Sequence, residues 1–183
     1  MKALAALLAL ALAPAAPARE VAGVAVPETA TLGGATLPLH GAGLRKRVFF
    51  KVYVGALYID SKAKAAEALV SADVPKLVRM TFLRDVARDD VLKAFREGFE
   101  KNSAATAAQA AASLAQVEPA LPAEVKTGQV LLVSYQPGTG STLGVEGGAS
   151  ATVPGKAFAD ALFRNWLGPE PADADLKSGM LGN

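Results

Sequence analysis

The sequence of 183 residues contains no cysteine and one histidine, His40. A chain without cysteine forms no disulfide, has no thiolate nucleophile and builds no cysteine-based zinc or iron–sulfur site. His40 would have to serve any Ser-His-Asp triad, yet no G-x-S-x-G motif accompanies it, and we interpret it as an ordinary polar residue near a strand end. Asp89 and Asp90 are adjacent and are expected to cap a helix rather than form an acid–base pair. We therefore expect no catalytic residue, no metal site and no cofactor.

The sequence also lacks a concentration of charge of either sign. Lys and Arg number 19 against 17 Asp and Glu, and the two signs are interspersed. Nucleic-acid binding requires clustered cations that neutralise phosphates, so we expect no nucleic-acid partner. The PGTGST segment at 137–142 lacks the Lys-Ser/Thr pair of a phosphate loop and is interpreted as a hairpin turn. With 51% hydrophobic and 20% charged residues, the composition is that of one ordinary globular domain.

Long apolar runs are absent apart from one at the N-terminus. Lys2 precedes an apolar run at 3–13, and Ala16-Pro17-Ala18 follows as a small-residue cleavage site. The run is too short for the roughly 20 residues that span a bilayer. We predict a signal peptide over 1–18, a mature domain over 19–183 and a periplasmic or secreted location, with no stable membrane anchor after cleavage. The cysteine-free, alanine-rich style suggests a bacterial protein.

Alternation of apolar residues predicts several β-strands. In the segment 44–59, Val48, Phe50, Val52 and Val54 alternate and are expected to face the core. The intervening face from Arg45 to Tyr53 mixes polar and aromatic residues, and it is either a solvated surface or the wall of a pocket. Further strands are expected at 21–26, 36–39, 76–86, 130–135, 142–145 and 149–153.

Helical periodicity predicts helices over 62–70, from Asp89 or Asp90 to about 101, over 106–116 and over 156–167. The second of these carries Leu92, Phe95 and Phe99 on one face, and the last carries Phe158, Leu162 and Trp166. These residues are expected in a core before they are expected at a ligand. Together the elements predict an α+β fold with a sheet and helices packed on one side, followed by an unstructured tail after Pro169.

Three segments together resemble one known family. They are GAGLRKRVFFKVYVGALYI at 41–59, VRMTFLRDV at 78–86 and GKAFADALFRNWLG at 155–168. The chain resembles the chalcone isomerase-like family, specifically its exported bacterial branch, over almost the whole mature sequence. The resemblance implies an open-faced β-sandwich, in which a large antiparallel sheet carries a layer of helices on one face and the ligand cleft lies between sheet and helices.

The resemblance also implies a ligand site. Plant members are either isomerases that close a chalcone ring or non-catalytic proteins that bind fatty acids, and in both an Arg and a Tyr face the anionic end of the ligand. The family's G-V-R segment falls on Gly43-Leu44-Arg45, so Arg45 matches the functional arginine. A threonine that positions water in the plant enzymes falls on Tyr53, and the functional tyrosine falls near Arg88 or Asp89, where no tyrosine is present. Two places are open for Arg45, the cleft or a tight turn at Lys46.

A cation without the positioning hydroxyls favours anion binding over catalysis. Our hypothesis is an exported, non-catalytic domain that binds a hydrophobic or amphiphilic small molecule such as a fatty acid, with Arg45, Tyr53, Phe95 and Phe99 as ligand-binding residues. Two alternatives remain. One is an intramolecular lyase of the chalcone isomerase type, and the other is a protein-interaction module that uses the face from Phe49 to Tyr53.

Overall fold

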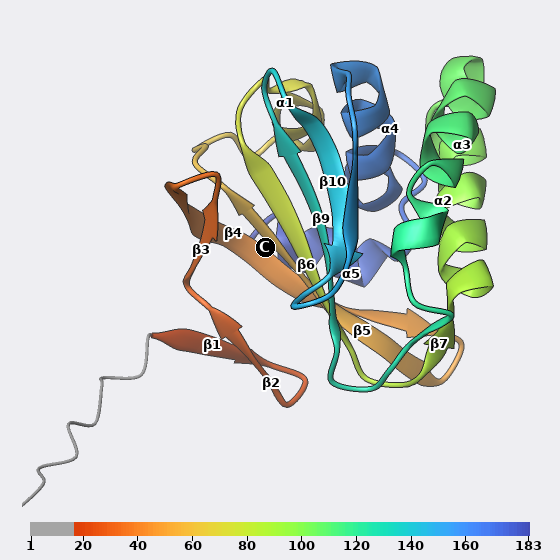
Figure 1. The fold of residues 1–183 in the computed structure, drawn as a ribbon. Helices are drawn as coiled ribbons and strands as arrows, with labels where there is room; N and C mark the ends of the chain where they lie inside the picture. The colour runs from red at the N-terminus through yellow and green to blue at the C-terminus, as the bar shows by residue number, and fades with distance from the viewer. Residues whose placement is uncertain (1–16) are drawn as a thin grey trace, which may run out of the picture.

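The computed structural model describes residues 17–183 and contains a curled sheet of seven antiparallel strands (Figure 1). The strand order is β11-β10-β9-β6-β5-β4-β3. Two separate two-stranded sheets, β1 with β2 and β7 with β8, lie outside it. The strands are β1 (Ala18–Val21), β2 (Val24–Pro27), β3 (Thr29–Leu32), β4 (Ala35–Arg47), β5 (Phe50–Ile59), β6 (Lys76–Phe82), β7 (Val86–Ala87), β8 (Glu124–Val125), β9 (Val130–Gln136), β10 (Gly140–Val145) and β11 (Ser150–Val153).

Five α-helices cover one face of this sheet, and Figure 1 shows α2, α3 and α4 standing beside it. They are α1 (Ala66–Ser71), α2 (Arg88–Asn102), α3 (Ala107–Ala115), α4 (Lys156–Leu167) and α5 (Ala174–Met180). The predicted cap at Asp89 or Asp90 is wrong, because α2 begins one residue earlier and its N-cap, Ala87, makes no side-chain bond. Both aspartates lie in the first turn, where their charge still favours the positive end of the helix dipole. The architecture confirms the expected α+β open-faced sandwich.

The two faces of the sheet carry two apolar clusters of unequal size. Tyr53, Leu57 and Phe82 belong to the large cluster under the helices, whereas Val54 and Tyr58 belong to a smaller cluster on the opposite face. Alternate residues of a strand point to opposite faces, so β5 is buried on both sides from residue 52 onward. The smaller cluster also takes residues from β2, β3 and β4.

The predicted core face of β5 is wrong at its start. Val48 and Phe50 are exposed at the turn, although the alternation placed them in the core with Val52 and Val54. The register shifts between Arg45 and Lys46, where Arg45 pairs with Tyr53 but Lys46 pairs with Lys51. This bulge gives the strand an extra residue, Val52, so the simple alternation of two does not continue through it.

The C-terminal tail is a helix rather than an unstructured segment. Helix α5 buries Leu176 and Met180 against β4, where a Cβ on Gly41 would lie only 2.3 Å from the Gly179 carbonyl oxygen. A Cβ on Gly43 would lie 2.9 Å from the Leu176 carbonyl oxygen. The two glycines of the GAG segment therefore allow backbone to approach backbone, which is one physical reason for glycine inside a strand.

A buried lysine on a neighbouring strand caps the C-terminal end of helix α1. Lys76, the first residue of β6, has no exposed surface, and its Nζ donates to the carbonyl oxygens of Leu69 (3.0 Å), Val70 (2.5 Å) and Ala72 (2.8 Å). The last carbonyls of a helix have no partner within it, and a cation there also interacts favourably with the helix dipole. Helix α1 has no basic residue in its own last turn, so Lys76 supplies one.

Most of the predicted signal peptide, residues 1–16, lies outside the described residues. From residue 17 onward, no helix has the length and hydrophobicity needed to cross a membrane.

Candidate functional site

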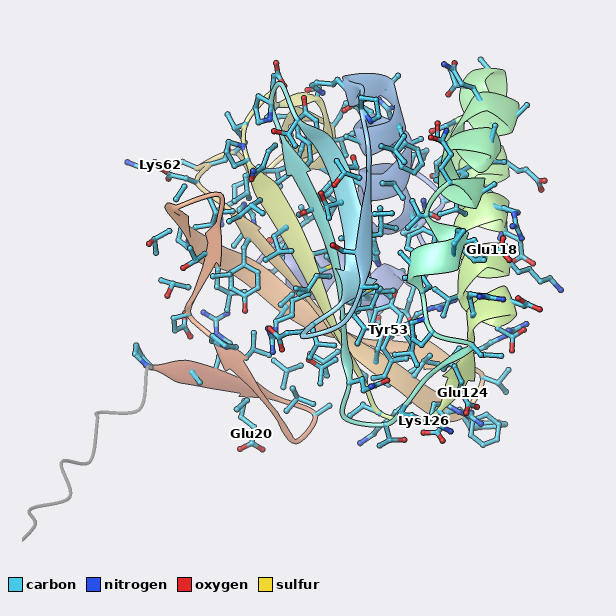
Figure 2. The ribbon with its side chains drawn as sticks, viewed as in Figure 1. Glu20, Tyr53, Lys62, Glu118, Glu124 and Lys126 are labelled. Carbon is cyan, nitrogen blue, oxygen red and sulfur yellow. The ribbon has the colours of Figure 1, made fainter. Side chains whose placement is uncertain are left out.

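A row of side chains from three adjacent strands forms the floor of the candidate site. Arg45 on β4 pairs with Tyr53 on β5, and Tyr53 pairs with Phe82 on β6. Arg45 shares its face of β4 with Gly41 and Gly43, the face that α5 covers. The three side chains therefore project toward the helices. Figure 2 shows Tyr53 in the interior between sheet and helices.

Two aromatic residues from the helices close over this floor. Phe95 of α2 and Trp166 of α4 meet edge to face, with ring centroids 5.7 Å apart. The indole Nε1 of Trp166 donates a hydrogen bond of 2.9 Å to the hydroxyl oxygen of Tyr53. A buried indole N–H requires an acceptor, so this bond fixes both side chains. Because indole only donates, the hydroxyl proton of Tyr53 is left to bond elsewhere.

Between the floor and the helices lies a small cavity of about 40 Å³, which we call the Arg45 pocket. A second hollow of about 80 Å³ adjoins it, and Arg45, Ala94, Asn165 and Ala172 line both. Arg45 thus lies between a mainly apolar hollow and a mainly polar one. The other residues of the Arg45 pocket are Val52, Tyr53, Met80, Phe82, Val86, Asp90, Val91, Phe95 and Trp166.

Arg45 brings an unused hydrogen-bond donor to the pocket. Its Nε is buried and has no partner among the described residues. Its guanidinium carbon lies 5.5 Å from the centroid of the Tyr53 ring, within the range of a cation–π contact. An unpaired buried donor is costly, and an anion in the pocket would satisfy it.

The Tyr53 hydroxyl remains protonated at neutral pH. Burial raises the pKa of this phenol, and the positive charge of Arg45 and the hydrogen bond from Trp166 oppose that increase only in part. A protonated hydroxyl is a donor, so Tyr53 and Arg45 together offer two donors to one bound group. A carboxylate can accept both.

The structure brings together three of the four residues that the sequence analysis proposed as ligand contacts. Arg45, Tyr53 and Phe95 line the Arg45 pocket, and Arg45 lies in the cleft rather than in the turn. Phe99 does not line it, because it lies one helical turn further along α2, fully buried with its ring centroid 6.3 Å from that of Phe158.

The pocket residues that sequence reasoning missed include Trp166 and Asn165, whose polar groups are buried. Trp166 was expected on the buried face of its helix but not at the site, although the need of its N–H for a partner was a usable signal. Asn165 is buried, and its amide donates to the carbonyl oxygens of Ala161 and Leu162. A polar residue inside a helix that was predicted apolar could have marked the same place.

Few other groups that could act in catalysis or metal binding lie near the pocket. Its one carboxylate, Asp90, belongs to an exposed residue at the first turn of α2. His40 is elsewhere, with its ring nitrogens 3.1 Å from the Met180 carbonyl oxygen and 3.0 Å from that of Ala63. Over residues 17–183, no group of three His, Asp or Glu side chains is arranged to hold a metal ion.

A larger hollow of about 300 Å³ lies on the other face of the sheet, and we call it the outer groove. It runs between β3 and the β9–β11 strands, with Leu32, Leu77, Leu132 and Val145 among its apolar residues. No cation lines it, so it offers apolar surface without an anion site.

Comparison with known proteins gives a family and a fold. A family model described as chalcone isomerase-like matches residues 18–182. Among solved structures, a fatty-acid binding protein of Arabidopsis thaliana has a similar fold, with a TM-score of 0.63 and 14% sequence identity over 87% of this chain and 92% of that one. No curated protein matches the sequence.

Proposed function

We propose that this chain, which belongs to the chalcone isomerase-like family, binds a hydrophobic small molecule with an anionic end, such as a fatty acid, and does not catalyse its conversion. The observation that carries the proposal is the buried Nε of Arg45, which has no partner in residues 17–183 and lies at an apolar pocket beside the Tyr53 hydroxyl. The similarity in fold to a plant fatty-acid binding protein supports the same class of ligand.

The polar groups of the pocket support binding rather than ring closure. An isomerase of this type needs groups that take up or deliver a proton and that order water. The raised pKa keeps Tyr53 protonated, and its oxygen is already occupied by Trp166. What remains is a pair of donors that hold an anion in place.

The size of the pocket implies that a long ligand must displace part of the protein. The Arg45 pocket measures about 40 Å³, far less than the roughly 300–1,000 Å³ of pockets that bury small-molecule ligands. A long tail therefore enters only when Phe95 and its helix α2 separate from the sheet. Each added methylene contributes favourable transfer from water, which offsets the cost of this opening.

We expect calorimetric affinity to increase along a series of fatty acids of increasing length. Each methylene should contribute up to about 0.8 kcal/mol. Arg45→Met, which keeps much of the bulk and removes the charge, should weaken binding by about 1.5–3 kcal/mol. The control is Arg96→Met on the outer side of α2, where the arginine does not line the pocket.

Three results would contradict this assignment. Absence of binding at every chain length would reject the ligand class. Binding that is unaffected by Arg45→Met but abolished by Leu132→Arg would move the ligand to the outer groove. Saturable acceleration of chalcone ring closure over a protein-free control would show that the domain is an isomerase.

We also propose that the chain belongs to the exported bacterial branch of the family and acts in the periplasm or outside the cell. The N-terminal pattern of Lys2, an apolar run and Ala16-Pro17-Ala18 supports this. The mature protein is expected to begin at Arg19, which intact-mass measurement of the exported chain tests. A mass that retains residues 1–18 after export would contradict it.

A further inference from the structure

The turn between β4 and β5 exposes three consecutive large apolar residues. Val48, Phe49 and Phe50 are 78%, 93% and 60% exposed, and they are the exposed large hydrophobic residues of the described chain. We call them the β4–β5 tip. In Figure 1 this hairpin extends past the rest of the sheet at the lower right, beside β7. Isolated exposed apolar residues are ordinary, but a contiguous group of this kind marks an interaction site.

Basic residues surround the β4–β5 tip. Lys46, Arg47 and Lys51 flank it on the two strands, and the Arg84 guanidinium lies 4.8 Å from the centroid of the Phe50 ring. All four are exposed, and within residues 17–183 none of them forms an ion pair. Their charge is therefore available to a partner.

Two features of the β4–β5 hairpin are unfavourable for its stability. Lys46 and Lys51 are direct cross-strand partners, and like charges in such positions repel. Val48 has φ of +56°, a backbone region that β-branched residues rarely adopt. Unfavourable charge, exposed apolar surface and backbone strain at one turn indicate a function outside the folded domain.

We propose that the β4–β5 tip docks reversibly on an anionic lipid surface, with Phe49 and Phe50 inserted among the headgroups and the four cations against lipid phosphates. Apolar side chains combined with Lys and Arg are the pattern by which proteins bind membrane interfaces. A second copy of the chain is a poor occupant, because tip-to-tip contact would bring two sets of cations together.

Docking would place the ligand site close to the lipid. Residues 52 and 53 line the Arg45 pocket and lie on β5 one residue beyond the tip. At about 3.3 Å per residue, Tyr53 lies only four residues, or roughly 13 Å, beyond Phe49. The surface would then bring the pocket to a source of amphiphilic molecules. The docking proposal does not depend on the ligand, since a calorimetric titration in solution tests the pocket and vesicle binding tests the tip.

The first experiment measures co-sedimentation of the protein with vesicles of phosphatidylcholine, with and without phosphatidylglycerol. We expect binding to the anionic vesicles and a decrease of roughly tenfold or more in partitioning for Phe49→Ser. Phe49→Trp should retain binding, and its emission should shift to the blue and be quenched by brominated lipid. Since the Phe49 side chain is almost fully exposed, these variants leave the packing unchanged.

The second experiment tests the charge. Lys51→Gln should weaken partitioning roughly fivefold, which corresponds to the contribution of one basic residue near an anionic surface. Added salt should weaken binding as well. The matched control is Lys62→Gln, because Lys62 is exposed at the opposite end of the molecule (Figure 2) and its loss should have little effect.

Absence of binding to anionic vesicles, or equal loss with Lys51→Gln and Lys62→Gln, would overturn the proposal. Vesicle binding by the wild type that Phe49→Ser leaves unchanged would overturn it too. Binding to an acidic protein surface in place of vesicles, lost with Phe49→Ser, would replace the lipid with a protein partner.

Discussion

Gly41→Ala is expected to lower the free energy of unfolding by about 3–5 kcal/mol, because it separates α5 from β4. The added methyl would lie 2.3 Å from the Gly179 carbonyl oxygen and 2.7 Å from that of Met180. Backbone atoms cannot rotate away, so the helix must move. Its departure exposes Leu176 and Met180, each of which is fully buried. The measurement is urea unfolding of the wild type and the variant, supported by a fall in Tm of roughly 10 °C.

Gly55→Ala provides the matched control for this prediction. Its added methyl would lie 3.1 Å from the end of the Leu176 side chain and 3.3 Å from the Tyr53 ring. These are side-chain atoms that need to move by only a few tenths of an ångström, which costs less than moving backbone. We expect a much smaller loss of stability. Leu176→Ala added to Gly41→Ala should cost less than Leu176→Ala alone, since α5 is already displaced. Equal effects of the two glycine variants, or full additivity with Leu176→Ala, would contradict the proposed clash.

Lys76→Ala is expected to cost about 3–5 kcal/mol, because it leaves three buried carbonyl groups without a donor and opens a cavity. Lys76→Met fills most of the space but still removes the donor, so we expect about 1–3 kcal/mol. Comparison of the two separates hydrogen bonding from packing. If Lys76→Met were as stable as the wild type, the three hydrogen bonds to α1 would contribute nothing.

Lys76 also predicts a dependence of stability on pH. Burial, with a smaller contribution from the neighbouring Lys156, lowers its pKa to about 8 from 10.5. Between these values the unfolded chain binds a proton that the folded chain does not, so stability from this group rises with pH and is lowest below pH 8. Lys76→Met should lack this increase of up to about 3 kcal/mol. The difference between the two unfolding curves from pH 8 to pH 10 isolates the contribution, because both proteins share every tyrosine.

The regular elements of the second half were predictable because each satisfies its own local pattern. The predicted helix at 156–167 matches α4 residue for residue, and its apolar stripe packs against the sheet as expected. Helix α5 was not predictable in this way. It is short, has only Leu176 and Met180 as buried residues, and depends on a groove that Gly41 and Gly43 create at the other end of the chain.

The same reasoning explains what could be predicted of the site. Family resemblance led to Arg45, and helical spacing led to Phe95. Both signals consist of residues that are close together in the sequence. The hydrogen bond between Trp166 and Tyr53 joins residues from two unrelated segments, so no local pattern contains it. The exposure of Val48 and Phe50 was missed because alternation shows that two faces differ and does not show where a strand stops being covered.

The contact of α5 with β4 has a consequence for when the domain can fold. The His40 ring on β4 lies within hydrogen-bond distance of the Met180 carbonyl oxygen, 140 positions later in the sequence, so the helix face of β4 is completed by residues that are synthesised long after it. A nascent chain still missing residues 174–180 cannot cover Gly41 and Gly43 or bury Leu176. Contacts this distant in sequence slow folding, because a long loop must close before they form. A chain in which residues 174–180 have not yet been synthesised therefore lacks the cover of β4 and cannot complete the native domain.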